Sequence, residues 1–444
     1  MTRSLHDSRR AVALIVVLLA MSVAVTVLAG LQAVSFRQAA SGRETAARFR
    51  AYWAARAGVE ATLARLEQSL DAGESGAGYA ELDAMLSAAS GELDGASWSI
   101  THDALRETRD GPADPHSKIN VNLMSADDLM LLSGMSEDVA DAILDWIDED
   151  DSPRPLGAEE GYYSQLASPY APRNGPVTSL RELELAAGVT PEDVRGEDWN
   201  LNGRLDPNED DGDETHPPDN ADGVLDAGWS AIITASSVEP ALDGGESAGG
   251  GQLRVDLLEA ETEELVSRIS SLDVGQATVI LDYGSREGSR VEDLISTSLQ
   301  QIAQQSSGLP ATVRNLNDQQ LRELLASCTV DDPTGPPRPG RINLNTVRRE
   351  TLDYVSALPA ALADALLVAR DASPTGFESL MDLLEVPAMS RQRLTRLSSI
   401  IGVEPGAYVI SSLGRDNATG TEAEVVVKVL RSSLPVPIVE VRTP

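Results

Sequence analysis

The sequence predicts an α+β fold, in which a long N-terminal helix packs on a small β-sheet that carries a large helical insertion. Three observations lead to this prediction. An apolar N-terminal stretch runs on into an amphipathic helical pattern, helical segments dominate the middle of the chain, and the residues from Gly406 onwards are β-prone.

The predicted N-terminal helix has an apolar half and an amphipathic half. Arg9 and Arg10 precede a stretch without charge that ends at Arg37, which is long enough to cross a bilayer. Because arginines beside a span stay on the cytoplasmic side, we expect residues 37–444 on the far side. Some sixty helical residues would reach about 90 Å at ~1.5 Å per residue. The apolar face of the second half holds Tyr52, Val59, Leu63, Leu66 and Leu70.

The helical middle of the chain repeats itself. Ile-Asn-Val-Asn-Leu at 119–123 and Ile-Asn-Leu-Asn-Thr at 342–346 each precede two helical segments, and residues 253–257 begin a degenerate middle copy. Each copy has the pattern of a helix-hairpin-helix unit of the SAM-like kind, with two helices around a tight turn. We expect the Asn residues of the two outer copies to cap the following helices.

Shorter elements complete the prediction. Helices are expected at 79–89 and 178–187, and strands at 97–101 and 229–236. A C-terminal hairpin is expected from 408–413 and 423–430, with a last strand at 437–441.

Composition limits the classes of function. With 35 basic against 70 acidic residues and a formal net charge of −35, the chain repels nucleic acid and anionic lipid but suits hard cations. The single cysteine, Cys328, excludes an internal disulfide. The four histidines are isolated, and no phosphate loop or nucleophile elbow occurs, so we expect no enzymatic activity.

One segment fits a twelve-residue calcium loop. Oxygen-bearing side chains stand at its first, third, fifth, ninth and twelfth positions, Gly203 stands at the sixth, and Arg204 would contribute its carbonyl. The side-chain ligands would be Asp198, Asn200, Asn202, Asp206 and Glu209. The alternative is an acidic surface loop. Residues 219–226 echo this pattern weakly, because Pro218 and Trp229 would then occupy the first and last positions.

A third acidic group follows the predicted helix that ends near Asp148. Residues 145–151 hold a run of acids, and Glu159 and Glu160 come soon after. Negative charge at a helix C-terminus is unfavourable, so either a bound cation or a frayed, solvated helix end would explain the run.

These features together resemble the K-type minor pseudopilins of type II secretion systems, the general secretion pathway protein K family. The most specific part is the order of Asp-Trp-Ile-Asp-Glu-Asp, Gly-Ala-Glu-Glu-Gly-Tyr-Tyr and Pro-Tyr-Ala-Pro-Arg-Asn-Gly-Pro. The segments that carry the resemblance are 12–19, 52–60, 119–122, 145–150, 157–163, 169–176 and 179–183.

The resemblance implies a pilin-like subunit of the inner membrane that caps or initiates a periplasmic pseudopilus for protein secretion. Its partners would be the I- and J-type minor pseudopilins, the major pseudopilin and a prepilin peptidase, which would cut between Ala11 and Val12 and methylate the new terminus. Val16 stands where most pilin-like proteins carry Glu, and the K family lacks that Glu. The family also implies calcium ligands at Asp150, Glu159 and Glu160.

Two alternatives remain at this stage, a helix-hairpin-helix DNA-uptake protein and a plain membrane-anchored calcium-binding protein.

The expected organisation comprises a leader (1–11), a transmembrane helix (12–36), a helix extension with the first strands (37–117), a first helical domain (118–228), a middle repeat (229–328), a Pro-rich linker (329–341), a second helix-hairpin-helix domain (342–405) and C-terminal strands (406–444).

Overall fold

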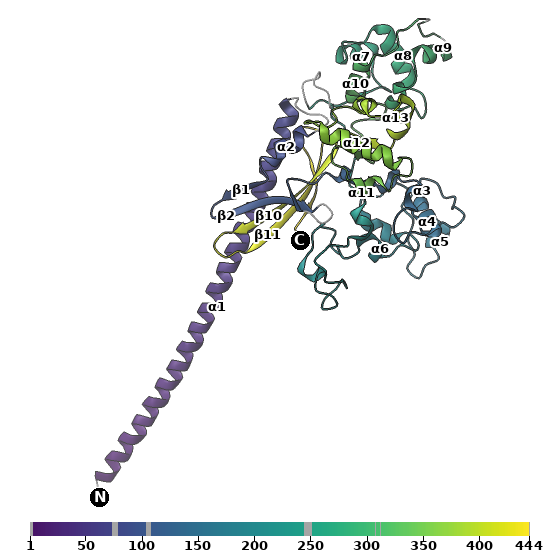
Figure 1. Ribbon diagram of the computed structural model, residues 1–444. Helices are drawn as coiled ribbons and strands as arrows, with labels where there is room; N and C mark the ends of the chain where they lie inside the picture. The colour runs from purple at the N-terminus through teal and green to yellow at the C-terminus, as the bar shows by residue number, and fades with distance from the viewer. Residues whose placement is uncertain are drawn as a thin grey trace.

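The computed structural model describes residues 3–72, 79–103, 108–243, 251–306, 308–310 and 312–443, with side chains from Leu14 onwards. A single helix, α1 (Arg3–Ala72), projects from a head in which a sheet lies against the helix and several groups of short helices lie beyond the sheet (Figure 1). The architecture is therefore a mixture of helix and sheet with a long N-terminal helix, as the sequence predicts.

The two halves of α1 have different surroundings. Its apolar side chains from Leu14 to Phe36 are all exposed, and this helix is the one candidate membrane span in the described residues. Further along, Val59, Leu66 and Leu70 are fully buried against the sheet. A continuous helix can thus serve as an anchor and as a structural element of the head.

One residue of the predicted apolar face is placed wrongly by the sequence. Tyr52 is 37% exposed, and the small residues Ala51, Ala54 and Ala55 face the sheet instead. The reason is distance, because α1 lies so close to the sheet that a Cβ on Gly414 would come within 1.9 Å of the Ala51 carbonyl oxygen. Only small side chains fit this contact.

The sheet joins the two ends of the chain. It is antiparallel with the order β1-β2-β10-β11-β12, and β3 also pairs with β2. Because β10 pairs directly with β2, everything between β3 and β10 is an insertion. The elements of this part are α2 (Ala80–Leu86), β1 (Ser90–Leu93), β2 (Ala96–Asp103), β3 (Thr108–Asp110), β10 (Ala407–Asp416), β11 (Glu422–Leu430) and β12 (Ile438–Arg442).

Three pairs of two-residue parallel strands bracket three segments of the insertion. They are β4 (Ile119–Asn120) with β5 (Ile233–Thr234), β6 (Val255–Asp256) with β7 (Cys328–Thr329), and β8 (Ile342–Asn343) with β9 (Ile401–Gly402). The segments share one continuous hydrophobic core, separate from the core between α1 and the sheet.

Short helices fill each segment. The first holds α3 (Ala126–Leu129), α4 (Glu137–Ile147), α5 (Glu160–Tyr163), α6 (Pro191–Arg195) and the 3-10 helices η2 (Val121–Leu123), η3 (Leu180–Leu185), η4 (Pro207–Glu209) and η5 (Gly228–Ala231), and the 3-10 helix η1 (Pro115–Ser117) precedes it between β3 and β4. The second holds α7 (Thr262–Arg268), α8 (Val274–Gly284), η7 (Val291–Ile295), α9 (Leu299–Gln305) and α10 (Asp318–Ser327). The third holds α11 (Arg349–Leu352), α12 (Ala360–Ala372), η8 (Leu380–Glu385) and α13 (Arg391–Leu397).

Two predicted elements differ from the structure. The expected strand at 229–236 is a 3-10 turn followed by the two-residue β5, since Trp229 is buried and donates its indole N–H to the Ser133 carbonyl at 2.8 Å. The expected helix at 178–187 is the 3-10 helix η3. In both places tertiary contacts override a local pattern.

The outer segments begin with the same hydrogen bonds. Asn120 and Asn343 each accept the backbone N–H two residues on, at 3.0 Å, so they cap a short turn rather than the α-helix after it. Asn122 donates to the Val177 carbonyl at 2.9 Å, as Asn345 does to that of Phe377. This likeness fits a duplication, while the helix-hairpin-helix class of the segments stays a prediction.

Candidate metal centre

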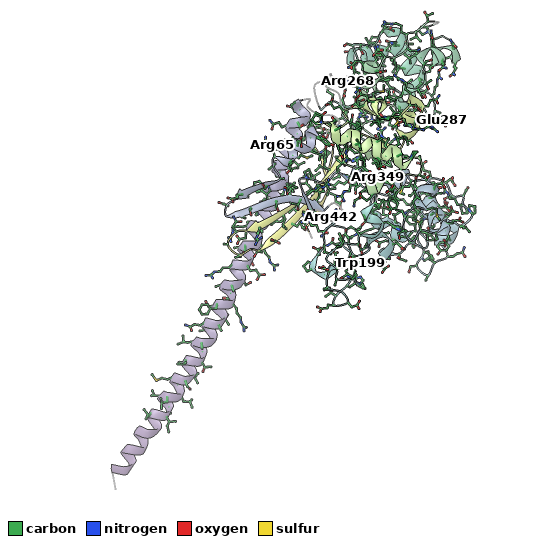
Figure 2. The ribbon with its side chains drawn as sticks, viewed as in Figure 1. Arg65, Trp199, Arg268, Glu287, Arg349 and Arg442 are labelled. Carbon is green, nitrogen blue, oxygen red and sulfur yellow. The ribbon has the colours of Figure 1, made fainter. Side chains whose placement is uncertain are left out.

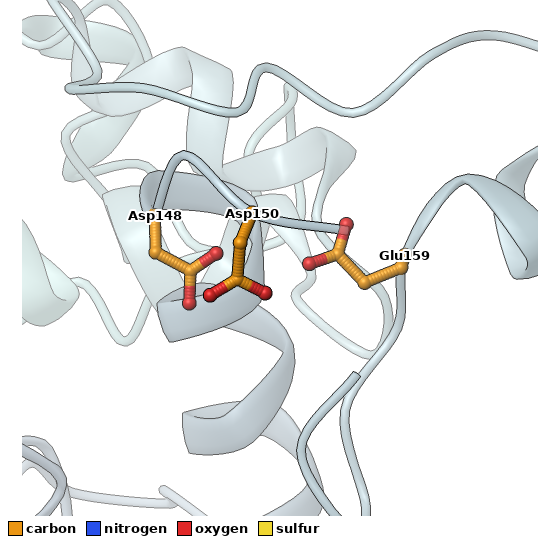
Figure 3. Close-up of side chains that lie close together, drawn as sticks. All are labelled: Asp148, Asp150 and Glu159. Atoms are coloured by element: carbon orange, nitrogen blue, oxygen red, sulfur yellow. The ribbon is translucent and has the colours of Figure 1, made fainter. Parts of the chain in front are cut away.

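Three carboxylates meet where α4 ends. Asp148 follows the last residue of α4, Asp150 lies in the next loop, and Glu159 immediately precedes α5. One oxygen atom of each lies within 4.8 Å of the other two. Figure 3 shows the three side chains gathered around a common space.

Arg154 holds the intervening loop against the end of α4. Its guanidinium donates to Asp145 at 2.7 Å and to Asp148 at 2.6 Å. A Cβ on Gly157 would come within 2.0 Å of the Asp145 carboxylate, so the loop needs glycine there. Burial lowers the pKa of Arg154, but its hydrogen bonds to Asp148 and Asp145 outweigh burial and raise that pKa.

Several buried oxygen atoms in and beside this cluster have no hydrogen-bond partner among the described residues. They are both carboxylate oxygens of Glu159, Oδ1 of Asp148 and Oδ1 of Asn174. Glu159 is 4% exposed. The Asn174 amide donates to Asp151, the residue after Asp150, at 2.8 Å. A buried carboxylate without a partner is strongly unfavourable unless a cation neutralises it.

The charge of the cluster acts on Glu159. Burial and then the negative charges of its acidic neighbours, with Asp145 and Asp148 first, raise the pKa of Glu159 to about 7. A divalent cation would reverse this effect by attraction. Carboxylate and amide oxygens on a loop suit calcium, which accepts six to eight oxygen ligands in flexible geometry. Asp148, Asp150 and Glu159 therefore fit a calcium ion.

The sequence predicts part of this set. Asp150 and Glu159 lie in the cluster, whereas Glu160 is exposed in the first turn of α5 and lies outside the group. Asp148 is missing from the prediction. The signal for Asp148 is its place at the end of α4, where an acid is unfavourable without a cation.

The side chains of the predicted calcium loop accept hydrogen bonds from other groups of the same loop. Asp206 accepts the side-chain amides of Asn200 at 2.7 Å and of Asn202 at 2.9 Å. Asp198 accepts two backbone N–H groups at 2.9 and 3.0 Å. Glu209 accepts two more at 3.0 Å, one from each arm of the loop. The five predicted side chains therefore belong to one hydrogen-bonded ring, which Figure 2 locates by Trp199.

The backbone of this loop follows the prediction at Gly203. Gly203 has a φ of +74°, which the sharp turn requires. Burial raises the pKa of Asp198 and of Glu209. The Arg204 guanidinium turns away to Glu424 in β11 at 3.0 Å, so it ties the loop to the sheet. A calcium ion in this loop, with the Arg204 carbonyl as a ligand, stays a prediction.

The second acidic segment repeats the first at the level of hydrogen bonds. Asp226 accepts the amide of Asn220 at 3.2 Å, as Asp206 does with Asn200. The backbone N–H of Asp222 bonds Asn220 at 2.9 Å in the same pattern. The two loops therefore share one local fold.

The structure corrects the sequence alignment of the second loop. That alignment puts Pro218 and Trp229 at its first and last positions, but these two residues do not close the loop. Glu197 accepts the backbone N–H groups of Asn220 at 3.1 Å and Asp226 at 3.0 Å, and Asp210 accepts that of Gly223 at 2.9 Å. Acids that flank the first loop thus complete the second. The sequence pattern misses them because it assumes contiguous ligands.

The predicted cleavage site lies at the start of α1. The backbone of Ala11 and Val12 is helical, and their side chains lie outside the described residues. Cleavage between them stays a prediction.

Comparison with known proteins finds similarity to one family model and to solved structures. Residues 104–196, which contain the carboxylate cluster, match the family model described as "Type II secretion system (T2SS), protein K". No curated protein matches the chain significantly. Among solved structures, a chain in the GspK-GspI-GspJ complex from the type 2 secretion system of enterotoxigenic Escherichia coli is similar, with 13% sequence identity and a TM-score of 0.46 over 92% of this chain and 99% of that chain.

Proposed function

We propose that this chain is a minor pseudopilin of the protein K family of type II secretion systems, and that it caps or initiates the tip of a periplasmic pseudopilus. The observation that carries the proposal is the match of residues 104–196 to protein K. The role is structural rather than catalytic. A head of this size on one helix suits the end of a fibre, where it meets no subunit above it.

The exposed apolar half of α1 supports a single membrane anchor. Arg9 and Arg10 at its start would remain in the cytoplasm. With that orientation, the sheet and the whole insertion lie in the periplasm.

An aromatic patch on α1 supports contact with other pseudopilins. Phe49 and Trp53 pack edge to face with ring centroids 5.9 Å apart, and Tyr52 lies 5.7 Å from Trp53. All three side chains are exposed, and Phe49 and Trp53 lie on the side of α1 opposite its sheet-facing alanines. Phe49 stands about 20 Å beyond Phe36 at ~1.5 Å per residue, which is above the lipid headgroups, so a protein helix is the fitting occupant. The proposed partners are the I- and J-type minor pseudopilins and the major pseudopilin.

We also propose that calcium binds at Asp148, Asp150 and Glu159. The unbonded buried oxygens and the raised pKa of Glu159 support this site. The ion would tie the end of α4 to the start of α5 and so stabilise the first segment of the insertion.

Acidic partners of two arginines count against the DNA-uptake alternative. Arg349 pairs with Asp353 and Asp364, each at 2.5 Å, and Arg391 pairs with Asp318. These two arginines are therefore less available to a phosphate backbone.

N-terminal processing tests the proposed function. Mass spectrometry of the chain from its native membrane should find a methylated Val12 at the N-terminus, and deletion of the gene should abolish secretion through the type II pathway. An intact Met1 in a chain whose deletion leaves secretion unchanged would contradict the proposal.

A further inference from the structure

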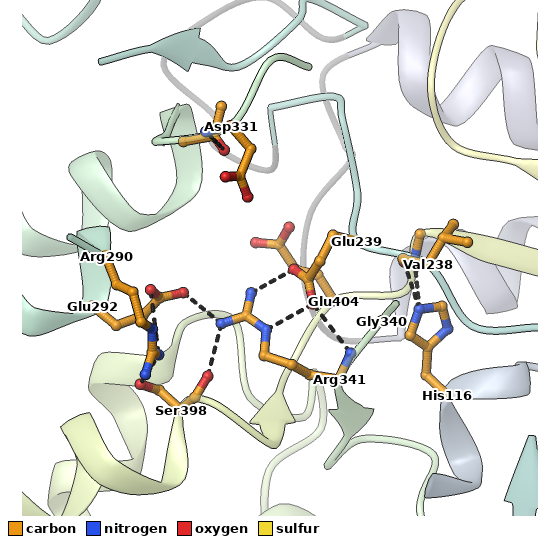
Figure 4. Close-up of polar contacts among 12 residues, drawn as sticks. His116, Val238, Glu239, Arg290, Glu292, Asp331, Gly340, Arg341, Ser398 and Glu404 are labelled. Carbon is orange, nitrogen blue, oxygen red and sulfur yellow. Dashed lines mark hydrogen bonds and ion pairs between the residues drawn. The ribbon is translucent and has the colours of Figure 1, made fainter. Parts of the chain in front are cut away.

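His116 lies where the sheet and the insertion join. It belongs to η1 between β3 and β4 and is 1% exposed. The connection around Val238 and Gly340 meets it from one side (Figure 4), and the residue before β10, Gly406, meets it from another. A Cβ on Gly340 would come within 2.6 Å of His116 Nε2. The ring is therefore enclosed by three separate parts of the chain.

Asp114 fixes one nitrogen of this ring. Its carboxylate accepts the His116 backbone N–H, His116 Nδ1 and the Asn343 amide at 2.8 Å each, and the Thr346 hydroxyl at 2.6 Å. Burial alone would raise its pKa, but the His116 charge and these hydrogen bonds hold the pKa of Asp114 below its ordinary value. An ionised Asp114 requires a proton on Nδ1 of His116.

The other ring nitrogen, Nε2, lies near one hydrogen-bond acceptor and one hydrogen-bond donor. His116 Nε2 lies 2.8 Å from the Val238 carbonyl oxygen, an acceptor, and 3.2 Å from the Gly406 backbone nitrogen, a donor. A protonated Nε2 can donate to Val238, whereas a neutral Nε2 can only accept from Gly406. The ring cannot make both hydrogen bonds at once.

We propose that His116 is a protonation-dependent joint between the sheet and the helical insertion. The imidazolium bonds Val238 and pairs with Asp114, so it ties the insertion to η1. The neutral ring releases Val238 and bonds Gly406 at the entry to β10. The joint is therefore tighter when the ring is protonated than when it is neutral, and histidine is the side chain whose charge ordinarily changes in the physiological pH range.

The other charges around the joint are balanced in pairs. On the insertion side, Arg341 bonds Glu239 at 2.8 Å and Glu292 at 2.5 Å (Figure 4). On the sheet side, Arg431 pairs with Glu81 at 2.8 Å and Glu404 at 3.7 Å, and the Tyr408 hydroxyl donates to Glu81 at 2.8 Å. Asp114 is thus the charge that faces the ring directly.

Distance measurements on the full chain in detergent micelles test the joint. Spin labels at Arg65→Cys on α1 and Val368→Cys on α12 report the placement of the insertion, and the buried Cys328 stays unlabelled. In excess calcium, which holds Glu159 ionised, we expect the distance distribution to shift and broaden between about pH 6 and about pH 8.

Two variants test whether the response to pH comes from the His116 ring. His116→Gln should remove the response to pH, whereas His216→Gln, whose ring lies against Trp199 in the acidic loop, should keep it. A wild-type distribution that does not change with pH, or a His116→Gln response equal to that of wild type, would overturn the proposal. If His116→Gln does not fold, the ¹⁵N shift of Nε2 in the wild-type chain decides, and a shift that stays constant over this range also overturns it.

Discussion

At the scale of the residue, Glu159 shows how burial and charge together select a ligand. Its two oxygens are buried without a partner among the described residues, and burial, followed by the charges of four aspartates, raises the pKa of Glu159 to about 7. Such a carboxylate destabilises the folded state when it is ionised and no cation is bound, and it stabilises the folded state once a cation binds to it. The same carboxylate therefore destabilises the calcium-free protein and is the group that we propose as a calcium ligand.

This arrangement predicts an unusual pH dependence in the presence of a chelator. Because the folded state holds the Glu159 proton more tightly than the unfolded state, stability falls as pH rises from about 4.5 to about 7 and then levels off. Glu159→Gln should remove a destabilisation on the order of 1–2 kcal/mol at pH 8. Thermal unfolding of the chelated full chain in detergent micelles at pH 6 and pH 8 measures the effect.

Glu160→Gln is the matched control for this prediction. Its side chain is exposed in the next position of the chain and lies outside the cluster. It should keep the wild-type slope in chelator. Excess calcium should raise the melting temperature of wild type and of Glu160→Gln more than that of Glu159→Gln. Equal calcium effects in all three proteins would rule out Glu159 as a ligand.

At the scale of the element, the close contact between α1 and the sheet depends on glycine, which has no side chain to hold the two apart. A Cβ on Gly58 would come within 2.4 Å of Ser412 Oγ and 2.6 Å of the Trp98 ring. Trp98 cannot move away easily, because its indole N–H bonds the Ala88 carbonyl at 3.2 Å. Small residues in the middle of α1 thus set its distance from β2 and β10.

We therefore expect Gly58→Ala to destabilise the head by about 1–3 kcal/mol through overpacking. Gly42→Ala is the matched control in the same helix, since nothing lies within 4 Å of a Cβ at that position. It should be neutral or slightly stabilising, by up to about 1 kcal/mol, because alanine favours a helix over glycine. Thermal unfolding followed by circular dichroism compares the two. A Gly58→Ala protein as stable as Gly42→Ala would mean that α1 can shift on the sheet.

At the scale of the whole molecule, the head leaves one side of α1 uncovered. The alanines of α1 are buried against the sheet, whereas Phe49 and Trp53 are exposed, and the insertion lies beyond the sheet (Figure 1). An exposed group of large aromatic rings is unfavourable in a free subunit and becomes useful when a second helix covers it. The uncovered side is where assembly would take place.

Loss of the rings should weaken that assembly. Trp53→Ala should reduce co-purification of the other minor pseudopilins with this chain from membranes by at least about tenfold, as expected for an interface aromatic worth about 1.4 kcal/mol or more. Arg65→Ala, another exposed substitution on α1, should leave co-purification unchanged. Unchanged recovery with Trp53→Ala would place the interface elsewhere.

The sequence by itself determined the elements whose pattern is local. The apolar run and its amphipathic continuation predicted α1, β-branched residues predicted the hairpin of β10 and β11, and the order of acidic and aromatic motifs indicated the protein K family. Hydrophobic periodicity is a property of neighbours along the chain, so no tertiary information was needed.

Tertiary structure alone decided what meets across the chain. Only the folded loops bring Asp148 and Asp150 to Glu159, let Glu197 and Asp210 complete the second loop, and place Tyr52 outside a contact that is too close for its ring. It is likewise the junction of three distant segments that gives His116 two opposed partners. The sequence gives the chemistry of each side chain, but the distances between residues that are remote in the chain are set only when the core packs.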